Sequence, residues 1–304
     1  MELKPGCRVG IDMGGTKIAG VMLGADDEIL SEFRAPTPRD HYEQTVETIA
    51  IVIAEVERMA GASGTVGIGM PGSLSPVSGL VQNSNSVWLN QKPLAQDAER
   101  VIGRPLRFSN DANCFALSEA VDGAAAGARG VFGVILGTGC GGGLVFNGQI
   151  VEGPNRCGGE WGHTPLPWPS EDEFPGPTCW CGRPGCMELW LSGTGLALDH
   201  LNRTGENLPA IEVARKAPTD AAARATLDRH VSRLARGLSM MTNIFDPDMI
   251  VLGGGLSQMP HLYEEVPPLM EKWVFADEPK VRIVPPRYGD ASGVRGAARL
   301  WEKT

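Results

Sequence analysis

A strand that runs into a glycine turn and returns as a second strand occurs twice in this chain of 304 residues. The first copy covers 9–23, and the second covers 131–146 with a turn at 137–143. Glycine has no Cβ, so the backbone at such a turn can approach a ligand closely. The repetition predicts two related α/β halves that face one cleft.

The length of the chain also favours two domains, because 304 residues exceed one typical core and are few for three. The Ala- and Gly-rich segment 123–130 resembles a connection beside a hinge. We therefore expect one α/β domain at 1–118 and a second at 119–292. A C-terminal helix at about 293–304 is expected to pack back on the first domain.

Polar residues follow the predicted strand at 105–108, where the sequence reads Ser109-Asn110-Asp111-Ala112-Asn113. Open α/β sheets bind ligands at such strand ends because the connecting loops converge there. A carboxylate at Asp111 can accept the proton of a hydroxyl that attacks a phosphoryl group. The alternative is that these residues only cap a helix that starts near Cys114.

The glycine turns are candidate phosphate loops, because their backbone N–H groups can reach phosphate oxygens. Thr16, Lys17 and Thr138 add side-chain donors, and Asp12 is a candidate ligand for the Mg²⁺ that bridges phosphates. Either turn alone is compatible with a plain hairpin, but two together, with 253–255 as a third, favour a nucleotide. Their spacing matches neither a P-loop nor a dinucleotide-binding motif.

Three cysteines lie within eight residues, at Cys179, Cys181 and Cys186, and His163 lies upstream. This set predicts a closed tetrahedral zinc site with a structural role. The alternatives are unrelated thiols beside a surface histidine, or a disulfide that leaves one thiol over. The remaining cysteines are expected to be small buried side chains: Cys7, Cys114, Cys140 and Cys157.

The net charge of −9 argues against a nucleic-acid-binding surface, which needs clustered Lys and Arg. The longest apolar runs, such as 131–136, are far shorter than the roughly 18 residues that cross a bilayer. The N-terminus has no signal-peptide core. We therefore expect a cytoplasmic protein with neither a membrane nor a nucleic acid as partner.

Taken together, these motifs resemble the ROK family of sugar kinases and repressors, within the two-domain hexokinase/actin-like ATPase (ribonuclease H-like) fold. The resemblance covers nearly the whole chain and rests on five segments: 12–17, 109–113, 136–143 with 158–163, 179–186 and 251–255. It implies phosphoryl transfer from ATP to the 6-hydroxyl of a hexose, with Asp111 as general base. It also implies Mg²⁺ and structural Zn²⁺ as cofactors and a homodimer.

The resemblance and the motifs assign two sets of binding residues. The sugar would be held by Asn85, Asn110, Glu160, His163 and Glu188. The nucleotide and its metal would contact Asp12, Gly14, Gly15, Thr16, Lys17, Gly137, Thr138, Gly139, Gly254 and Gly255. DNA-binding members carry an N-terminal helix-turn-helix, which we do not expect here because the first loop starts at Asp12.

The stretches 83–90 and 159–168 most resemble bacterial fructokinase and mannokinase members. We therefore expect fructose as substrate, with mannose or glucose possible. The alternative is an N-acetylhexosamine or glucose kinase. A non-catalytic sugar-sensing regulator is the alternative from another class, and intact Asp12 and Asp111 argue against it because a sensor needs no base.

Overall fold

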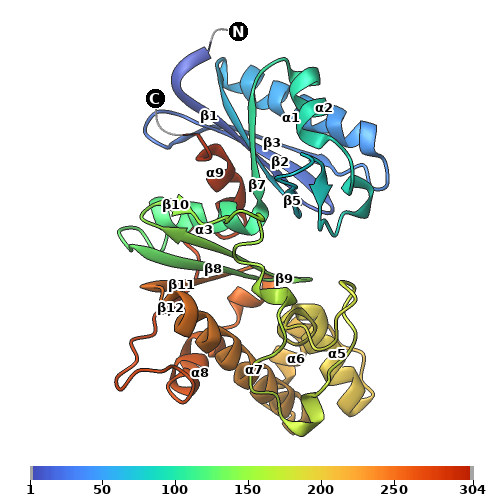
Figure 1. The fold of residues 1–304 in the computed structure, drawn as a ribbon, viewed down its shortest axis with the longest axis vertical. Coiled ribbons are helices and arrows are strands. Elements are labelled where there is room, and N and C mark those ends of the chain that lie inside the picture. The colour runs from blue at the N-terminus through green and yellow to red at the C-terminus, as the bar shows by residue number, and fades with distance from the viewer. Residues whose placement is uncertain (1–2, 302–304) are drawn as a thin grey trace.

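The computed structural model describes residues 3–301, in which two five-stranded sheets lie on either side of a layer of helices (Figure 1). The first sheet has the order β3-β2-β1-β4-β7. In it β1 pairs antiparallel with β2 and parallel with β4. Its strands are β1 (Leu3–Met13), β2 (Lys17–Leu23), β3 (Ile29–Pro36), β4 (Ser63–Met70) and β7 (Leu106–Asn110).

The second sheet repeats this pattern in the order β10-β9-β8-β11-β12, with β8 antiparallel to β9 and parallel to β11. Its strands are β8 (Gly130–Leu136), β9 (Cys140–Phe146), β10 (Gln149–Ile150), β11 (Met249–Gly253) and β12 (Ile283–Val284). The matching orders confirm the predicted repetition of one strand arrangement in the two halves.

Helices cover the outer face of each sheet (Figure 1). On the first sheet lie α1 (Tyr42–Ala60) and α2 (Leu94–Ile102), and between β4 and α2 the chain forms a hairpin of β5 (Ser73–Leu74) and β6 (Val81–Gln82). On the second lie α4 (Glu188–Leu191), α5 (Gly193–Thr204), α6 (Ala210–Lys216), α7 (Ala221–Phe245) and α8 (His261–Met270). Among the described residues, no helix is long and apolar enough to cross a membrane.

The layer between the sheets consists of α3 (Asp111–Val121) and α9 (Ser292–Ala298), which pack on each other. Close approach depends on glycine, since a Cβ on Gly10 would lie 2.0 Å from the Val294 carbonyl oxygen. A Cβ on Gly296 would lie 1.7 Å from the carbonyl oxygen of Cys114. Backbone therefore packs on backbone where α9 meets β1 and α3.

The predicted division at 118/119 falls inside α3, so the domain limits stay a prediction. The last part of the predicted C-terminal helix, 302–304, lies outside the described residues.

The second glycine turn is shorter than the predicted 137–143, because β9 already begins at Cys140. A Cβ on Gly143 would lie 2.4 Å from the Ala112 carbonyl oxygen, and one on Gly142 would lie 2.8 Å from the Trp161 ring. These glycines therefore let α3 and Trp161 pack against β9, and the turn itself is Gly137–Gly139.

Candidate active site

The ends of β4 and β7, the β8–β9 turn and the start of α4 line one cavity of about 160 Å³. It brings together the predicted base, all five predicted sugar-binding residues and the second glycine turn: Asn85, Asn110, Asp111, Gly137, Thr138, Gly139, Glu160, His163 and Glu188. Residues more than 100 positions apart in the sequence thus meet in one cavity. Pro71 and Gly72, which follow β4, also line it.

A larger cavity of about 820 Å³ lies on the other side of the β8–β9 turn and shares Gly137 and Thr138 with the first. Its lining is mostly apolar and includes Ala197, Leu198, Leu201, Ile211, Leu256 and Met259, with Gly255 beside them. The Gly193 amide donates to the Gly137 carbonyl (2.7 Å), and the Thr194 hydroxyl donates to the Thr138 carbonyl (2.9 Å). The start of α5 thereby fixes the turn between the two cavities.

Asp111 is the first residue of α3, and Asn110 is its N-cap. The Ala112 amide donates to Asn110 Oδ1 and to Asp111 Oδ1, each at 2.9 Å, and Asn110 Nδ2 donates to the Gly72 carbonyl (3.1 Å). The capping interpretation therefore holds for Asn110 without excluding a chemical role for Asp111. Burial raises the pKa of Asp111, although hydrogen bonds to its carboxylate from the Ala112 amide, from its own amide and from the Asn110 side chain oppose the shift.

Carboxyl groups crowd around this site. Burial, followed by the charge of Asp111, raises the pKa of Asp12 to about 7, while Lys17 acts in the opposite direction. Burial and the charges of Asp111 and Glu188 also raise the pKa of Glu160. So much negative charge in one place favours a bound proton or a cation, and Asp12 therefore fits a metal ligand.

Asp290 also raises the pKa of Asp12 and was missed in the sequence. It follows β12 in a short turn and carries no motif that would have revealed it.

Glu188 is held on both carboxylate oxygens. The Cys140 amide donates to Oε2 (3.1 Å), and Trp180 Nε1 donates to Oε1 (2.7 Å). A Cβ added to Gly139 would lie 2.7 Å from Oε2, so the glycine turn and Glu188 are in close contact. The sequence singled out Glu188 but not Trp180, although Trp180 stands between two of the predicted metal ligands.

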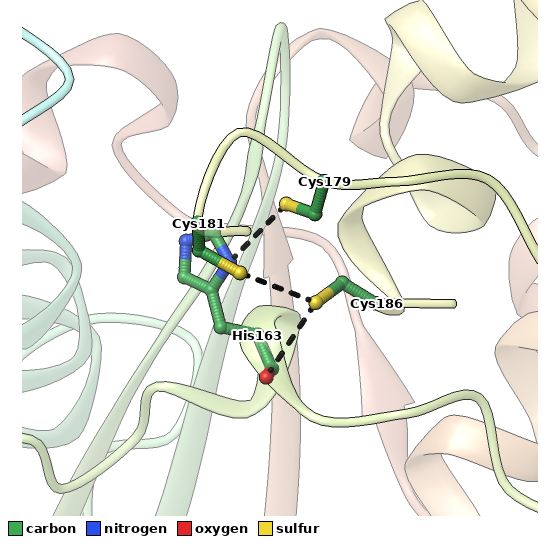
Figure 2. Close-up of side chains that lie close together, drawn as sticks. All are labelled: His163, Cys179, Cys181 and Cys186. Atoms are coloured by element: carbon green, nitrogen blue, oxygen red, sulfur yellow. Dashed lines mark hydrogen bonds between the residues drawn. The ribbon is translucent and has the colours of Figure 1, made fainter. Parts of the chain in front are cut away.

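The predicted zinc ligands form one cluster, in which His163, Cys179, Cys181 and Cys186 point toward one another (Figure 2). Their ligand atoms all lie within 4.8 Å of one another. The Cys179 Sγ to His163 Nδ1 distance is 3.7 Å, and Cys181 Sγ lies 3.5 Å from Cys186 Sγ. A tetrahedron with metal–sulfur bonds of about 2.3 Å has edges of roughly 3.8 Å, so the donors fit a tetrahedral ion.

Of the other cysteines, Cys7, Cys114 and Cys140 are buried as expected, but Cys157 is exposed.

Six predicted nucleotide residues line neither of the two cavities among residues 3–301: Asp12, Gly14, Gly15, Thr16, Lys17 and Gly254. The first turn is a hairpin in which the Gly14 amide donates to the Lys17 carbonyl (2.9 Å). Gly254 adjoins the second turn, because its Cβ would lie 2.6 Å from the Leu136 carbonyl oxygen. The roles of these residues stay predictions.

Comparison with known proteins identifies the family and the fold of this chain. A model of the ROK family matches residues 8–304. The chain belongs to the ROK family. A ROK hexokinase from Thermus thermophilus superposes with a TM-score of 0.84 at 32% identity, over 96% of each chain. A ROK glucokinase from Streptomyces griseus, solved with glucose and AMPPNP, gives 0.80 at 27% identity, over 98% of this chain and 100% of that one. The chain therefore has the predicted hexokinase/actin-like ATPase fold.

Similarity to known sequences favours the alternative substrate over fructose. The chain is 42% identical over 296 residues to an N-acetyl-D-glucosamine kinase of Photobacterium profundum, covering 96% of this chain and 98% of the relative. An N-acetyl-D-glucosamine kinase of Yersinia enterocolitica is 40% identical over the same length, covering 96% and 98%. The prediction of fructose has no support in these relatives, and the alternative of an N-acetylhexosamine kinase fits better.

Proposed function

We propose that this chain, an ATP-dependent sugar kinase of the ROK family, phosphorylates the 6-hydroxyl of N-acetyl-D-glucosamine. One observation carries the proposal: the Asp111 carboxyl and the Gly137–Gly139 turn line the same cavity, together with the polar residues expected to hold a sugar. The similarity to N-acetyl-D-glucosamine kinases supports the choice of sugar.

In the proposed reaction the sugar hydroxyl oxygen attacks the γ-phosphorus of ATP. A bond forms between that oxygen and phosphorus, the bond to the β-phosphate oxygen breaks, and ADP leaves. A carboxylate oxygen of Asp111 accepts the proton of the sugar hydroxyl as the new oxygen–phosphorus bond forms. Its position beside the β8–β9 turn supports this role.

The nucleotide is proposed to lie across the β8–β9 turn. The apolar walls of the larger cavity suit the flat adenine ring, and Gly137–Gly139 would then lie beside the phosphates. Asp12 and the backbone of Gly14 to Lys17, in the β1–β2 turn of the first sheet, would hold the magnesium-bound phosphates. Mg²⁺ would neutralise phosphate charge there.

The sugar is proposed to contact Asn85, Asn110, Glu160, His163 and Glu188, which offer carboxylate, amide and imidazole partners for hydroxyl groups. We propose that zinc binds His163, Cys179, Cys181 and Cys186 as a scaffold. Coordination through Nδ1, which faces Cys179 Sγ, would leave Nε2 of His163 for the sugar.

A homodimer is proposed as the assembly. Apolar side chains gather near the end of α7, where the exposed Trp168 stacks on the partly buried Trp273 with ring centroids 4.9 Å apart. Phe275, two residues further along the chain, is 99% exposed. The Asn243 side chain, near the end of α7, bonds the backbone of both Trp273 and Phe275 and so fixes this segment. Exposed apolar patches mark interaction surfaces. Light scattering should give twice the chain mass, and the mass of one chain at micromolar concentration contradicts the dimer.

A coupled assay with ATP across N-acetylglucosamine, glucose, mannose and fructose tests the proposed function. We expect N-acetylglucosamine to give the highest kcat/KM. A higher value for another sugar would replace the proposed substrate. Sugar binding without phosphorylation of any sugar would favour the non-catalytic regulator.

A further inference from the structure

Trp180 is an exposed side chain with a well-defined polar partner. It is 58% exposed, stands between Cys179 and Cys181 in the cysteine loop, and donates its indole N–H to Glu188 Oε1 at 2.7 Å. Its ring meets the His163 ring edge-on, with centroids 4.9 Å apart and an interplanar angle of 87°. The indole therefore touches two residues of the small cavity from outside its lining.

The partner of Trp180 is a carboxylate with one donor on each oxygen. The Cys140 amide holds Glu188 Oε2 and the indole holds Oε1, so rotation about the last side-chain bond would break both hydrogen bonds. Each carboxylate oxygen accepts about two hydrogen bonds. One acceptor position on each oxygen is therefore left for a ligand in the cavity.

The cysteine loop keeps the indole in place. The flanking cysteines belong to the cluster with His163, and the Gly182 amide donates to the Cys179 carbonyl (2.9 Å). The backbone beside Trp180 is thus fixed through the cluster, while Glu188 begins α4. A hydrogen bond from the indole is the direct side-chain link between the loop and this carboxylate.

We propose that Trp180 is a positioning residue, which transmits the fixed geometry of the cysteine cluster to Glu188 and so sets the affinity for the sugar. The inference rests on the proposed function, since it assumes that Glu188 accepts sugar hydroxyls. Trp180 has no role in the chemical step.

The test compares Trp180→Phe, which keeps an aromatic ring and removes the indole N–H, with Trp301→Phe. Trp301 also donates its indole N–H, to the Val66 carbonyl (2.6 Å), but lines neither cavity within the described residues. We measure the Kd for N-acetylglucosamine by calorimetry, together with kcat, both KM values and zinc content. Each single variant is repeated in a Glu188→Ala background.

Trp180→Phe should raise the sugar Kd and KM about tenfold, as expected when a charge-assisted hydrogen bond is lost. The kcat, the KM for ATP and the zinc content should stay within about twofold, and Trp301→Phe should leave the sugar Kd unchanged. In the Glu188→Ala background, Trp180→Phe should have no further effect.

An unchanged sugar Kd in Trp180→Phe overturns the inference. An equal rise with and without Glu188, or a loss of zinc, also overturns it, because Trp180 would then act through the fold. If the wild-type protein binds a sugar without phosphorylating it, only the proposed function fails. If it binds no sugar, both fail.

Discussion

The two halves of the molecule share a strand arrangement but differ in what surrounds their glycine turns. The β1–β2 turn is exposed and is flanked by the charged residues Asp12 and Lys17. The β8–β9 turn has no charged residue and lies between two cavities, with Glu188 against Gly139. One fold thus supplies charge on one side and a rigid neutral backbone on the other, with Asp111 between the sheets.

The largest effect is expected where the halves meet, at Asp111. Asp111→Asn keeps an oxygen for the Ala112 amide but removes the proton acceptor. The kcat should fall about 10³-fold, within the range for a lost general base. Calorimetry should still detect sugar binding.

Asp228→Asn is the matched control, since Asp228 is an exposed carboxylate paired with Arg224 on α7. Its kcat should equal that of the wild-type protein. An equal kcat for Asp111→Asn would remove the base from the mechanism.

The cysteine cluster distinguishes the second half from the first, and Cys181→Ser tests it. Loss of one ligand should release zinc, lower the Tm and weaken sugar binding together, because metal binding contributes to folding. Cys157→Ser is the control, since Cys157 is an exposed thiol outside the cluster. Elemental analysis should give about one zinc per chain for the control and none for Cys181→Ser; equal metal content in both would contradict the zinc site.

Replacing one glycine of each turn by alanine compares the β1–β2 and β8–β9 turns directly. A Cβ on Gly139 would lie 2.7 Å from Glu188 Oε2, whereas a Cβ on Gly15 would have no atom within 4 Å among the described residues. Gly139→Ala should therefore displace the carboxylate and raise the KM for sugar about tenfold, a difference of about 1.4 kcal/mol. Gly15→Ala should leave the sugar KM unchanged. Equal sugar KM values in both variants would mean that the turns do not differ as described.

The smallest effects concern pH. Burial raises the pKa of Asp12 in the folded protein to about 7, well above the ordinary value of an aspartate, so the folded protein binds a proton that the unfolded chain has released between these values. The free energy of unfolding therefore falls as pH rises from about 4 to 7. Asp12→Asn should raise the Tm of the ligand-free protein more at pH 8 than at pH 5.

Lys17→Met should raise the pKa of Asp12 further, since the charge of Lys17 lowers that pKa. If ionised Asp12 binds the magnesium-bound phosphates, kcat/KM rises with pH near 7, and this limb should move to higher pH in Lys17→Met. If the pH profile of kcat/KM is unchanged in Lys17→Met, ionised Asp12 does not bind the magnesium-bound phosphates.

Much of this arrangement is predictable because apolar strands and glycine turns are local signals. The sequence extends the second turn too far, over 142–143, because the need for glycine there is tertiary: a Cβ on Gly143 would lie 2.4 Å from the carbonyl oxygen of Ala112, in the helix between the sheets. The influence of Asp290 on Asp12 could not be predicted from the sequence, because only the fold brings these two carboxyl groups near each other. The expectation of fructose has no support among the relatives, whose names favour the alternative of an N-acetylhexosamine. The sequence did not decide between these sugars because the choice between a hydroxyl and an acetamido group depends on cavity shape.

Phosphorus NMR of the wild-type protein with magnesium, ATP and N-acetylglucosamine tests the central claim most directly. We predict that the γ-phosphate signal is replaced by that of a sugar 6-phosphate as ADP accumulates, and only when the sugar is present. Release of inorganic phosphate at the same rate without sugar, or unchanged ATP with every sugar offered, would contradict the account.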